Sequence, residues 1–320
     1  MTTVTSGPGV AVGLGVKPPA LTDGLPLLPL DAGEQYRFAF DMGACVGCHS
    51  CEVACAEQNG NPVGVNWRKV GEVESGRYPT VARFSLSMSC NQCLEPTCLS
   101  GCPTNAYVKL DNGVVKHLAD SCIGCQYCVW NCPYEAPVFN PERRVVTKCD
   151  MCLPRLEAGQ LPACVGACPT GALTIEKVDV DAWREDNTGA DGPGLPPSSI
   201  TLPTTRIILP GGLAADAQPA RTWAVSPEHP HWPLIVLTLL TQLSVGTVAA
   251  AVATHSRSGA AVAALAGAVA LIASVGHLGR PAHAWKALRN LRRSWLSREV
   301  LLFGMFSAAA LAYAGSGAKP

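Results

Sequence analysis

Residues 122–133 read CIGCQYCVWNCP, with cysteines at positions 122, 125, 128 and 132 and a proline directly after the last. Three cysteines separated by two residues each let one tight loop reach three corners of an iron–sulfur cube. The fourth follows about one helical turn later and points away, where it can ligate a second cube. This stretch therefore predicts a loop-rich fold built around [4Fe–4S] clusters.

The chain of 320 residues has sixteen cysteines, and all of them lie between residues 45 and 168. They fall into four groups of four, and a cubane cluster takes four thiolates. The count thus predicts four [4Fe–4S] clusters and a role in electron transfer. The groups are Cys45, Cys48, Cys51 and Cys55; Cys90, Cys93, Cys98 and Cys102; Cys122, Cys125, Cys128 and Cys132; and Cys149, Cys152, Cys164 and Cys168.

Two other uses of these cysteines fit their spacing less well. Closely spaced triplets such as C-x2-C-x2-C have poor disulfide geometry, and disulfide frameworks are typical of small secreted chains. Structural zinc favours two C-x2-C pairs with a longer spacer between them. The spacing also indicates that the groups exchange their fourth cysteines in crossed pairs, as in ferredoxins with two clusters. Spacing alone leaves open which groups pair.

A short repeat follows three of the groups. The frame C-P-x-x-A begins at Cys102, Cys132 and Cys168, and each copy leads into an apolar, strand-like stretch. Asp111-Asn112-Gly113 separates two such stretches and is a strong hairpin signal. We therefore expect an α+β domain with a duplicated bacterial-ferredoxin-like arrangement of short strands, short helices and loops.

Composition divides the chain into four parts. Residues 1–35, rich in Gly, Pro and Thr and without a signal-peptide pattern, are predicted to be a flexible extension, and residues 36–180 are the four-cluster domain. Residues 181–228, rich in Pro, Gly, Asp and Ser, are predicted to be a linker or a surface-lying arm. Residues 229–320 are predicted to be an all-α membrane anchor. The net charge of zero gives no indication of nucleic-acid binding.

Three apolar runs in the anchor predict membrane spans at about 232–254, 259–277 and 300–315. Residues 229–256 contain no Asp, Glu, Lys or Arg, and 232–253 is long enough to cross a hydrocarbon core of about 30 Å. Small residues dominate 260–268, a composition suited to close packing against other helices. The third run is short, so we expect a shortened anchor or further helices from another chain.

Basic residues indicate the orientation of the spans. The connection between the first two spans carries only Arg257, whereas the connection between the second and third is rich in Lys and Arg. Its basic residues are Arg280, Lys286, Arg289, Arg292, Arg293 and Arg298. Basic loops favour the cytoplasmic side, so we expect this connection and the cysteine domain on the cytoplasmic face of a bacterial inner membrane. The alternative is that these residues bind lipid headgroups or a partner subunit.

Several runs of the chain resemble the iron–sulfur subunit of the dimethyl sulfoxide reductase family of molybdopterin enzymes. They are CVGCHSCEVACAEQNG at 45–60, SCNQCLEPTCLSGCPTNA at 89–106, and KCDMC and CVGACPTGAL between 148 and 173. The runs HPHWPLIVLTLLTQ at 229–242 and HLGRPAHAWKALRNLRRSWLSREV at 277–300 resemble the N-terminal part of the membrane anchor of the same complexes. The chain therefore resembles a fusion of two subunits, although the family anchor has more helices.

The resemblance implies that the first group pairs with the fourth, and the second with the third. One cluster would use Cys45, Cys48, Cys51 and Cys168, and another Cys149, Cys152, Cys164 and Cys55. A third would use Cys90, Cys93, Cys98 and Cys132, and the last Cys122, Cys125, Cys128 and Cys102. This nested order implies a linear electron path, while pairing of neighbouring groups remains compatible with the spacing.

The resemblance also marks His277 and Glu299 as candidate quinone-site residues and Arg280 as a candidate for orienting the quinone headgroup. Quinol oxidation releases protons together with electrons, and an ionisable side chain near the membrane surface can accept them. The alternatives are that His277 caps a helix and that Glu299 pairs with Arg298 or Arg293.

Five other polar residues have simpler expected roles. His229 and His231 are predicted to be interfacial residues beside Trp232. Lys148, next to Cys149, and the nearby Arg143 and Arg144 could raise cluster potentials, but solvated positions are the simpler expectation.

The predicted function is that of a non-catalytic electron-transfer subunit in a membrane-bound molybdopterin oxidoreductase complex. Its clusters would connect a membrane quinone or quinol with a separate subunit that holds a molybdenum bis-pterin cofactor. The complex would reduce a substrate such as dimethyl sulfoxide or, in the oxidative direction, oxidise sulfite. The alternative is a membrane-tethered ferredoxin adaptor of a hydrogenase or formate dehydrogenase.

Overall fold

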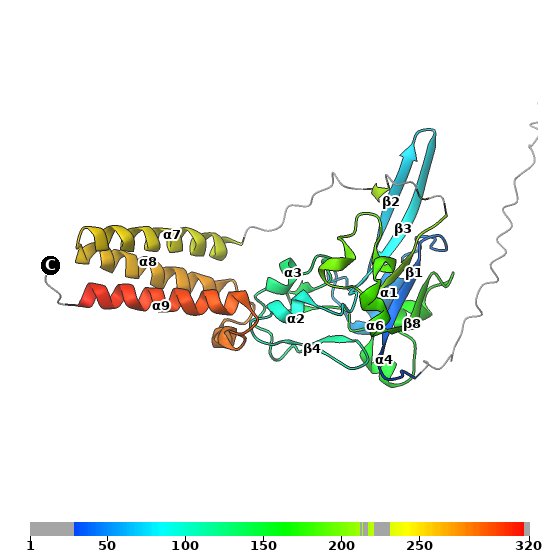
Figure 1. The fold of residues 1–320 in the computed structure, drawn as a ribbon, viewed down its shortest axis with the longest axis horizontal. Coiled ribbons are helices and arrows are strands. Elements are labelled where there is room, and N and C mark those ends of the chain that lie inside the picture. Colours follow the sequence, from blue (N-terminus) through cyan, green and yellow to red (C-terminus); the bar gives the residue numbers. More distant parts are fainter. Residues whose placement is uncertain (1–28, 212, 214–216, 221–230, 317–320) are drawn as a thin grey trace, which may run out of the picture.

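The structure is a computed structural model that describes residues 29–211, 213, 217–220 and 231–316. The molecule is elongated, with a cysteine-containing module at one end and three long helices at the other (Figure 1). Most of the predicted N-terminal extension lies outside the described residues, and residues 34 and 35 already belong to the first strand. The fold class expected from the sequence, an α+β module followed by apolar helices, is confirmed.

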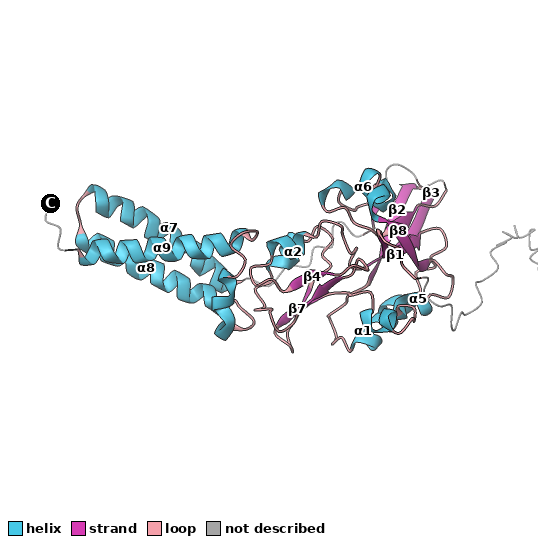
Figure 2. Cartoon of the chain, turned by 60° about the horizontal axis from the view of Figure 1, so that its bottom comes forward, coloured by secondary structure: helices cyan, strands magenta, loops and turns pink. Residues whose placement is uncertain are grey.

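The cysteine module consists of short helices and strands joined by loops (Figure 2). Its helices are α1 (Ser50–Asn59), α2 (Thr97–Gly101), α3 (Tyr127–Asn131), α4 (Leu153–Glu157), α5 (Ala163–Gly166) and α6 (Val180–Glu185), with 3₁₀ turns η1 (Thr188–Ala190) and η2 (Ser198–Ile200). Its strands are β1 (Glu34–Asp41), β2 (Lys69–Arg77), β3 (Thr80–Met88), β4 (Tyr107–Lys109), β5 (Val115–His117), β6 (Val138–Asn140), β7 (Val145–Thr147), β8 (Leu173–Asp179), β9 (Arg206–Ile208) and β10 (Gln218–Pro219). Elements this short leave much of the backbone in loops, where the cysteines lie.

A three-stranded sheet organises the core of the module. Strand β1 lies between β8, to which it is antiparallel, and β9, to which it is parallel. Phe38 and Phe40 on one face of β1 and Ala39 on the other are all buried, so the strand contributes to the core from both sides. Met151 and Leu173 pack in the same cluster, which joins the sheet to the cysteine loops.

The described part of the predicted linker is packed against this sheet. Strand β9 pairs with β1 and buries Ile207, and Trp183 donates its indole N–H to the Pro203 carbonyl oxygen at 2.9 Å. The segment buries one apolar side chain, and its backbone N–H and C=O groups form hydrogen bonds with β1. These contacts hold the segment on the sheet although its composition is rich in proline. The structure therefore extends the cysteine module beyond the predicted boundary at residue 180, to about residue 211.

The C-P-x-x-A repeat leads into strands, as expected. β4, β6 and β8 follow the copies at Cys102, Cys132 and Cys168. The hairpin predicted at Asp111-Asn112-Gly113 is confirmed, because β4 and β5 pair antiparallel around it and Gly113 has a φ of +88°. A second hairpin, β6–β7, repeats this arrangement.

The hairpin of β2 and β3 projects from the module (Figure 1). Its two strands pair from Lys69 opposite Met88 to Arg77 opposite Thr80. Tyr78 at its tip is 92% exposed, whereas Ser87 at its base is buried beside the cysteine loops. The base of the hairpin thus belongs to the core, and its tip does not.

Three helices are long and apolar enough to cross a membrane in the part of the chain that the structure describes: α7 (Trp232–Ala253), α8 (Arg257–Gly276) and α9 (Trp295–Gly315). The first two lie within two residues of the predicted spans. The third begins five residues earlier than predicted, because the Ser294 side chain caps it by accepting a hydrogen bond from the Ser297 N–H. The third span is therefore as long as the others.

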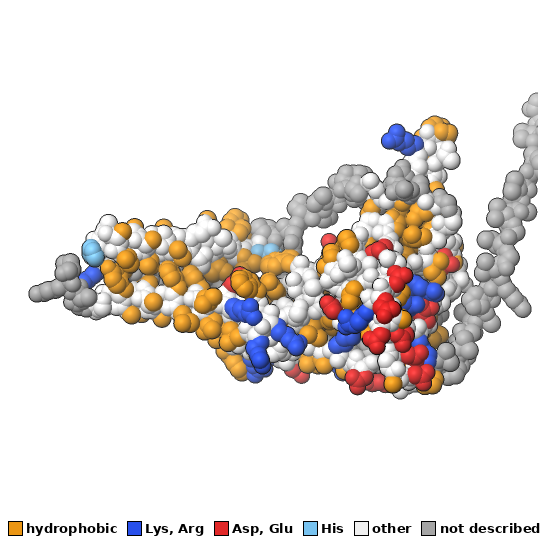
Figure 3. All heavy atoms as spheres, viewed as in Figure 1, with side chains coloured by type: hydrophobic (Ala, Val, Ile, Leu, Met, Phe, Trp, Pro, Cys, Tyr) orange, Lys and Arg blue, Asp and Glu red, His pale blue; other side chains and the backbone are white. Residues whose placement is uncertain are grey.

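Small residues pack the three helices together. Ala260, Ala263 and Gly267 of α8 are buried, and Ser244 of α7 donates its hydroxyl to the Ala263 carbonyl oxygen at 2.7 Å. A Cβ on Gly267 would lie 2.9 Å from the Ser307 hydroxyl oxygen of α9. The face of the helices seen in Figure 3 is largely apolar, as expected for a surface in contact with lipid.

Candidate metal centres

The sixteen cysteines are gathered into four quartets, each made of three cysteines from one sequence group and the fourth cysteine of another. Quartet A is Cys45, Cys48, Cys51 and Cys168; quartet B is Cys55, Cys149, Cys152 and Cys164; quartet C is Cys90, Cys93, Cys98 and Cys132; and quartet D is Cys102, Cys122, Cys125 and Cys128. These are the sets that the family resemblance implies. That each set ligates one cluster stays a prediction.

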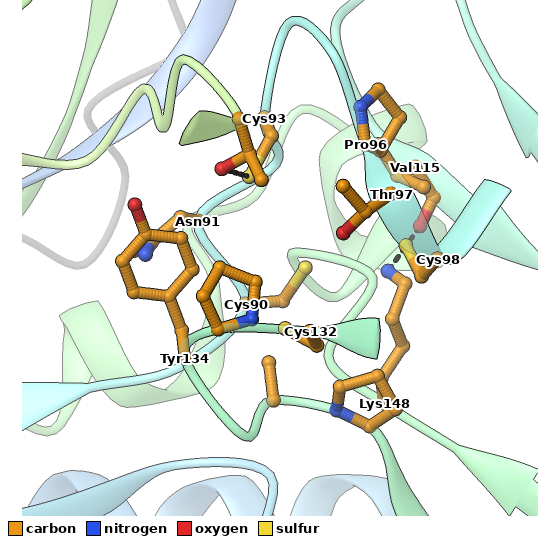
Figure 4. Close-up of a pocket in the computed structure, with 14 residues that line it drawn as sticks. Cys90, Asn91, Cys93, Pro96, Thr97, Cys98, Val115, Cys132, Tyr134 and Lys148 are labelled. Carbon is orange, nitrogen blue, oxygen red and sulfur yellow. Dashed lines mark hydrogen bonds between the residues drawn. The ribbon is translucent and has the colours of Figure 1, made fainter. Parts of the chain in front are cut away.

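Three of the quartets surround cavities. Quartets A, C and D each line one cavity with all four of their cysteines. Figure 4 shows the cysteines of quartet C around one such space, with Tyr134 and Lys148 at its margin. In the described residues, no three His, Cys, Asp or Glu side chains are placed to hold a single metal ion. The quartets therefore suit a cofactor larger than one zinc ion.

The backbone turns sharply within each cysteine loop. A non-glycine residue adopts left-handed φ in each: His49 (59°), Gln92 (47°), Gln126 (59°) and Met151 (58°). Such conformations cost of order 1–3 kcal/mol each and are typical of functional sites. They aim backbone N–H groups at sulfur, since the Met151 N–H donates to Cys149 Sγ at 3.4 Å. The loops are thus shaped to stabilise thiolates.

Side-chain hydroxyl groups also reach the sulfur atoms. The Thr201 hydroxyl donates to Cys93 Sγ at 3.2 Å, and the Tyr107 hydroxyl donates to Cys128 Sγ at 3.2 Å. Ser87 Oγ lies 3.4 Å from Cys51 Sγ. Hydrogen bonds to cluster sulfurs are one of the factors that set reduction potentials. The cysteine spacing contains no signal for these three residues, all of which lie outside the four cysteine groups.

Burial makes the free thiolate costly at most of these cysteines. It raises the pKa of Cys55, Cys93 and Cys125 to about 12. A buried thiolate therefore needs positive charge close by, which bound iron supplies. A second sign of a missing group is the buried Arg68 Nε–H, which has no hydrogen-bond acceptor. The residues of the quartets thus fit iron–sulfur clusters.

Lys148 is buried rather than solvated, which corrects the expectation from the sequence. Its side chain is enclosed at the margin of quartet C, and its ammonium group donates to the Cys149 carbonyl oxygen at 2.9 Å and to the Val115 carbonyl oxygen. Because Cys149 belongs to quartet B, Lys148 lies between two quartets. Arg143 and Arg144 are exposed, as expected.

The basic connection between α8 and α9, which includes the 3₁₀ helix η3 (Pro281–Leu288), docks on the loops of quartet D. The Gly279 N–H donates to the Gly124 carbonyl oxygen at 3.3 Å, and the Arg280 N–H donates to the Ile123 carbonyl oxygen at 3.0 Å. A Cβ on Gly124 would lie 2.9 Å from the Gly279 Cα, so the approach requires glycine. Lys286 adds a bond from its ammonium group to the Asp120 carbonyl oxygen at 3.0 Å.

A second set of contacts reaches the other side of quartet D. The Asn290 side-chain amide donates to the Cys102 carbonyl oxygen at 2.8 Å, and the Ser294 hydroxyl donates to the Gly101 carbonyl oxygen at 2.8 Å. Both side chains are buried. Quartet D is therefore the quartet at the membrane end of the module, and the basic connection lies on the same side of the helices as the cysteines (Figures 1 and 3).

The structure does not join the three predicted quinone-site residues to one another. His277 directly follows α8, where its N–H donates to the Val275 carbonyl oxygen, and Arg280 donates its guanidinium to the Ala119 carbonyl oxygen at 2.9 Å. Glu299 is exposed on α9, and within the described residues it forms no ion pair with Arg298. The quinone site stays a prediction.

His231 has a more specific environment than the predicted interfacial position beside Trp232. Its ring lies edge-on to the ring of Trp130, with centroids 5.7 Å apart. Trp130 belongs to α3, between Cys128 of quartet D and Cys132 of quartet C, and His231 lies within electrostatic range of His277. Trp130 of the cysteine module thus contacts the residue that precedes the N-terminal end of α7. His229 lies outside the described residues.

Two family models match separate parts of the chain. The model of a 4Fe-4S dicluster domain matches residues 81–178. The model of the DMSO reductase anchor subunit (DmsC) matches residues 227–314. Iron–sulfur clusters and a membrane location therefore follow for this protein, with both modules in one polypeptide.

Curated relatives cover mainly the cysteine module. One of the chains of the anaerobic dimethyl sulfoxide reductase of Haemophilus influenzae is 38% identical over 53% of this chain and 87% of its own length. One of the subunits of the sulfite dehydrogenase of Allochromatium vinosum is 37% identical over 43% of this chain and 67% of its own length. The formate dehydrogenase iron–sulfur subunit of Haemophilus influenzae is 36% identical over 48% of this chain and 55% of its own length. With its cysteine quartets and its attached anchor, this polypeptide belongs to the family of iron–sulfur electron-transfer subunits that includes the one of dimethyl sulfoxide reductase.

Proposed function

We propose that this protein is the electron-transfer subunit of a membrane-bound molybdopterin oxidoreductase complex, and that it connects a membrane quinone with a separate molybdenum-containing catalytic subunit. The observation that carries the proposal is the docking of the membrane connection on quartet D. A quartet held against the membrane anchor suits exchange of electrons with a carrier that is dissolved in lipid. The other quartets extend from there toward the opposite end of the module.

Each quartet is proposed to ligate one [4Fe–4S] cluster, and such clusters accept and release single electrons when bound. The order D, C, B, A follows from the residues between them. Tyr107 donates to Cys128 of quartet D and lies within electrostatic range of Cys98 of quartet C. Lys148 connects quartets C and B, and Cys51 of quartet A lies within electrostatic range of Cys164 of quartet B. The residues thus support a linear path.

Quartet A is the proposed contact with the catalytic partner. Cys48 is exposed, and Val46 and Val53 beside it are 66% and 67% exposed. Electron transfer needs close approach, and exposed apolar residues around a buried redox site favour a protein contact. The partner's substrate class is proposed from the relatives as dimethyl sulfoxide-like or sulfite. Because one relative is a formate dehydrogenase subunit, formate is the second candidate substrate.

The module is proposed to lie on the cytoplasmic face of a bacterial inner membrane. Arg280 and Lys286 contact the module, but Arg289, Arg292 and Arg293 remain exposed on the same connection. Exposed basic residues on this connection, against Arg257 alone on the connection between α7 and α8, favour the cytoplasmic side. Since the connection touches quartet D, the cysteines share its side.

Metal analysis of the complex purified through this protein tests the proposal. We expect about sixteen iron atoms per chain from four cubane clusters, together with molybdenum in a large copurifying subunit. About eight irons would contradict the four quartets as ligands. Copurification with nickel, or with no metal-containing partner, would contradict the proposed complex.

His277 is proposed to accept a proton at the quinone site. Replacing His277 by Phe should lower quinone-linked turnover about a hundredfold, the low end of what positioned acid–base groups contribute, and leave turnover with a soluble dye unchanged. The matched control is His255→Phe, since His255 lies at the α7–α8 connection, on the opposite side of the membrane. Equal loss of both activities in the His277 variant would indicate a structural role instead.

A further inference from the structure

Arg68 is a buried cation in the core of the cysteine module. Its side chain is 2% exposed and lies over the ring of Phe38, 4.7 Å from the centroid. One terminal nitrogen, Nη1, donates to Ser87 Oγ at 3.1 Å, and the other, Nη2, donates to Ser89 Oγ at 2.9 Å. The guanidinium is therefore held in one orientation at the base of the β2–β3 hairpin.

The charge of Arg68 has no carboxylate partner among the described residues. An arginine stays protonated in proteins, and a buried charge without an opposite charge is strongly destabilising. Its Nε–H is also buried without an acceptor. Both observations require an anionic group with hydrogen-bond acceptors close to Arg68.

The groups that face Arg68 are cysteines of two quartets. Cys55, Cys149 and Cys164 of quartet B and Cys51 of quartet A all lie within electrostatic range of its guanidinium. Ser87 links it further to quartet A, because Ser87 Oγ accepts from Arg68 and lies 3.4 Å from Cys51 Sγ. With its lone pair engaged by Arg68, the Ser87 hydroxyl can donate its own hydrogen to the Cys51 sulfur.

We propose that Arg68 is a positioning residue that raises the reduction potentials of the clusters in quartets A and B, directly at quartet B and through Ser87 at quartet A. The inference rests on the proposed ligation by these quartets. One-electron reduction adds one negative charge to a site that already holds four thiolates. A fixed positive charge and N–H and O–H donors at the sulfurs stabilise that added charge.

Potentiometric EPR titration of the purified complex tests this role. In Arg68→Met, the reduction equilibria of two of the four clusters should shift at least tenfold toward the oxidised form, which is about 59 mV per cluster for one electron. The other two should keep their wild-type potentials. Arg68→Lys retains the charge and should shift the same two clusters less than Arg68→Met does.

Arg37→Met is the matched control. Arg37 is also buried and lies over an aromatic ring, that of Trp183 at 4.4 Å, but it pairs with Glu176 and contacts no quartet. Glu176 keeps Arg206 as a partner at 3.0 Å. All four potentials should stay at their wild-type values in this variant.

Ser87→Ala provides a second test that leaves the charge in place. It should lower the potential of the quartet A cluster alone. If Arg68→Met fails to assemble its clusters, Arg68→Lys and Ser87→Ala decide the question. Wild-type potentials in fully loaded Arg68→Met, or equal shifts in all four clusters, would overturn the inference. Absence of cluster signals from the wild-type complex would instead overturn the proposed function.

Discussion

Replacing Cys132 by alanine is expected to abolish the EPR signal that replacing Cys90 abolishes, and to leave the signal that depends on Cys122. By sequence, Cys132 belongs with Cys122, but in the structure it lines the cavity of quartet C together with Cys90. The reciprocal variant, Cys102→Ala, should abolish the signal that depends on Cys122. Iron should fall from about sixteen to about twelve atoms per chain in each case.

EPR spectra of the four single variants, recorded together with their iron contents, check this expectation. Quinone-linked turnover should stop in each of them, because a gap in a linear path leaves no alternative route, whereas dye-linked turnover should persist. Ser100→Ala is the control, since Ser100 is exposed on α2 between Cys98 and Cys102. If Cys132→Ala and Cys122→Ala abolished one and the same signal, the crossed quartets would be wrong.

Replacing Lys148 by methionine is expected to shift the reduction equilibrium of the quartet C cluster at least tenfold toward the oxidised form. For one electron, this shift lowers the reduction potential by about 59 mV. The ammonium group is buried at the margin of quartet C, where the added electron is stabilised by its charge. Methionine fills similar volume but leaves the Val115 and Cys149 carbonyl oxygens without this donor. Each lost partner costs about 1–3 kcal/mol, so the free energy of unfolding should also fall.

Lys116→Met is the control for this variant. Lys116 follows Val115 in β5, but its side chain is exposed. Redox titration should therefore return wild-type potentials, and thermal unfolding a wild-type midpoint. Wild-type potentials in Lys148→Met as well would show that its charge is screened from the cluster, and that its role is confined to packing.

Much of the fold could be predicted from the sequence because strong local rules govern it. The Asp111-Asn112-Gly113 turn fixes its hairpin, and the charge-free run from residue 229 fixes the first span. The packing of α8 followed from small residues such as Ala260 and Gly267. Each of these signals acts over a few residues, so it does not depend on what else is nearby in space.

The remaining features depend on contacts between distant segments. Strand β9 consists of three residues after a Pro-rich stretch, and only its neighbour β1 identifies it as a strand. Arg68 was missed, and Lys148 was expected to be solvated, because charged residues are usually exposed. Their burial follows from the anionic cysteines gathered around them. The contact between Asn290 and Cys102 joins residues 188 positions apart, and no motif encodes it.

The contact between the basic connection and quartet D has a further consequence because both lie in one polypeptide. In separate subunits, a contact with a dissociation constant of 1 mM supplies only about 4 kcal/mol and is mostly open at cellular concentrations. Within one chain, the two surfaces meet at an effective concentration that reaches the millimolar range for short connections. A contact of that strength is then formed about half of the time, so the additional hydrogen bonds of Asn290 and Ser294 are enough to keep the electron path continuous. The one-to-one ratio of anchor and cysteine module is fixed when the chain is synthesised, so the two modules need no separate association step.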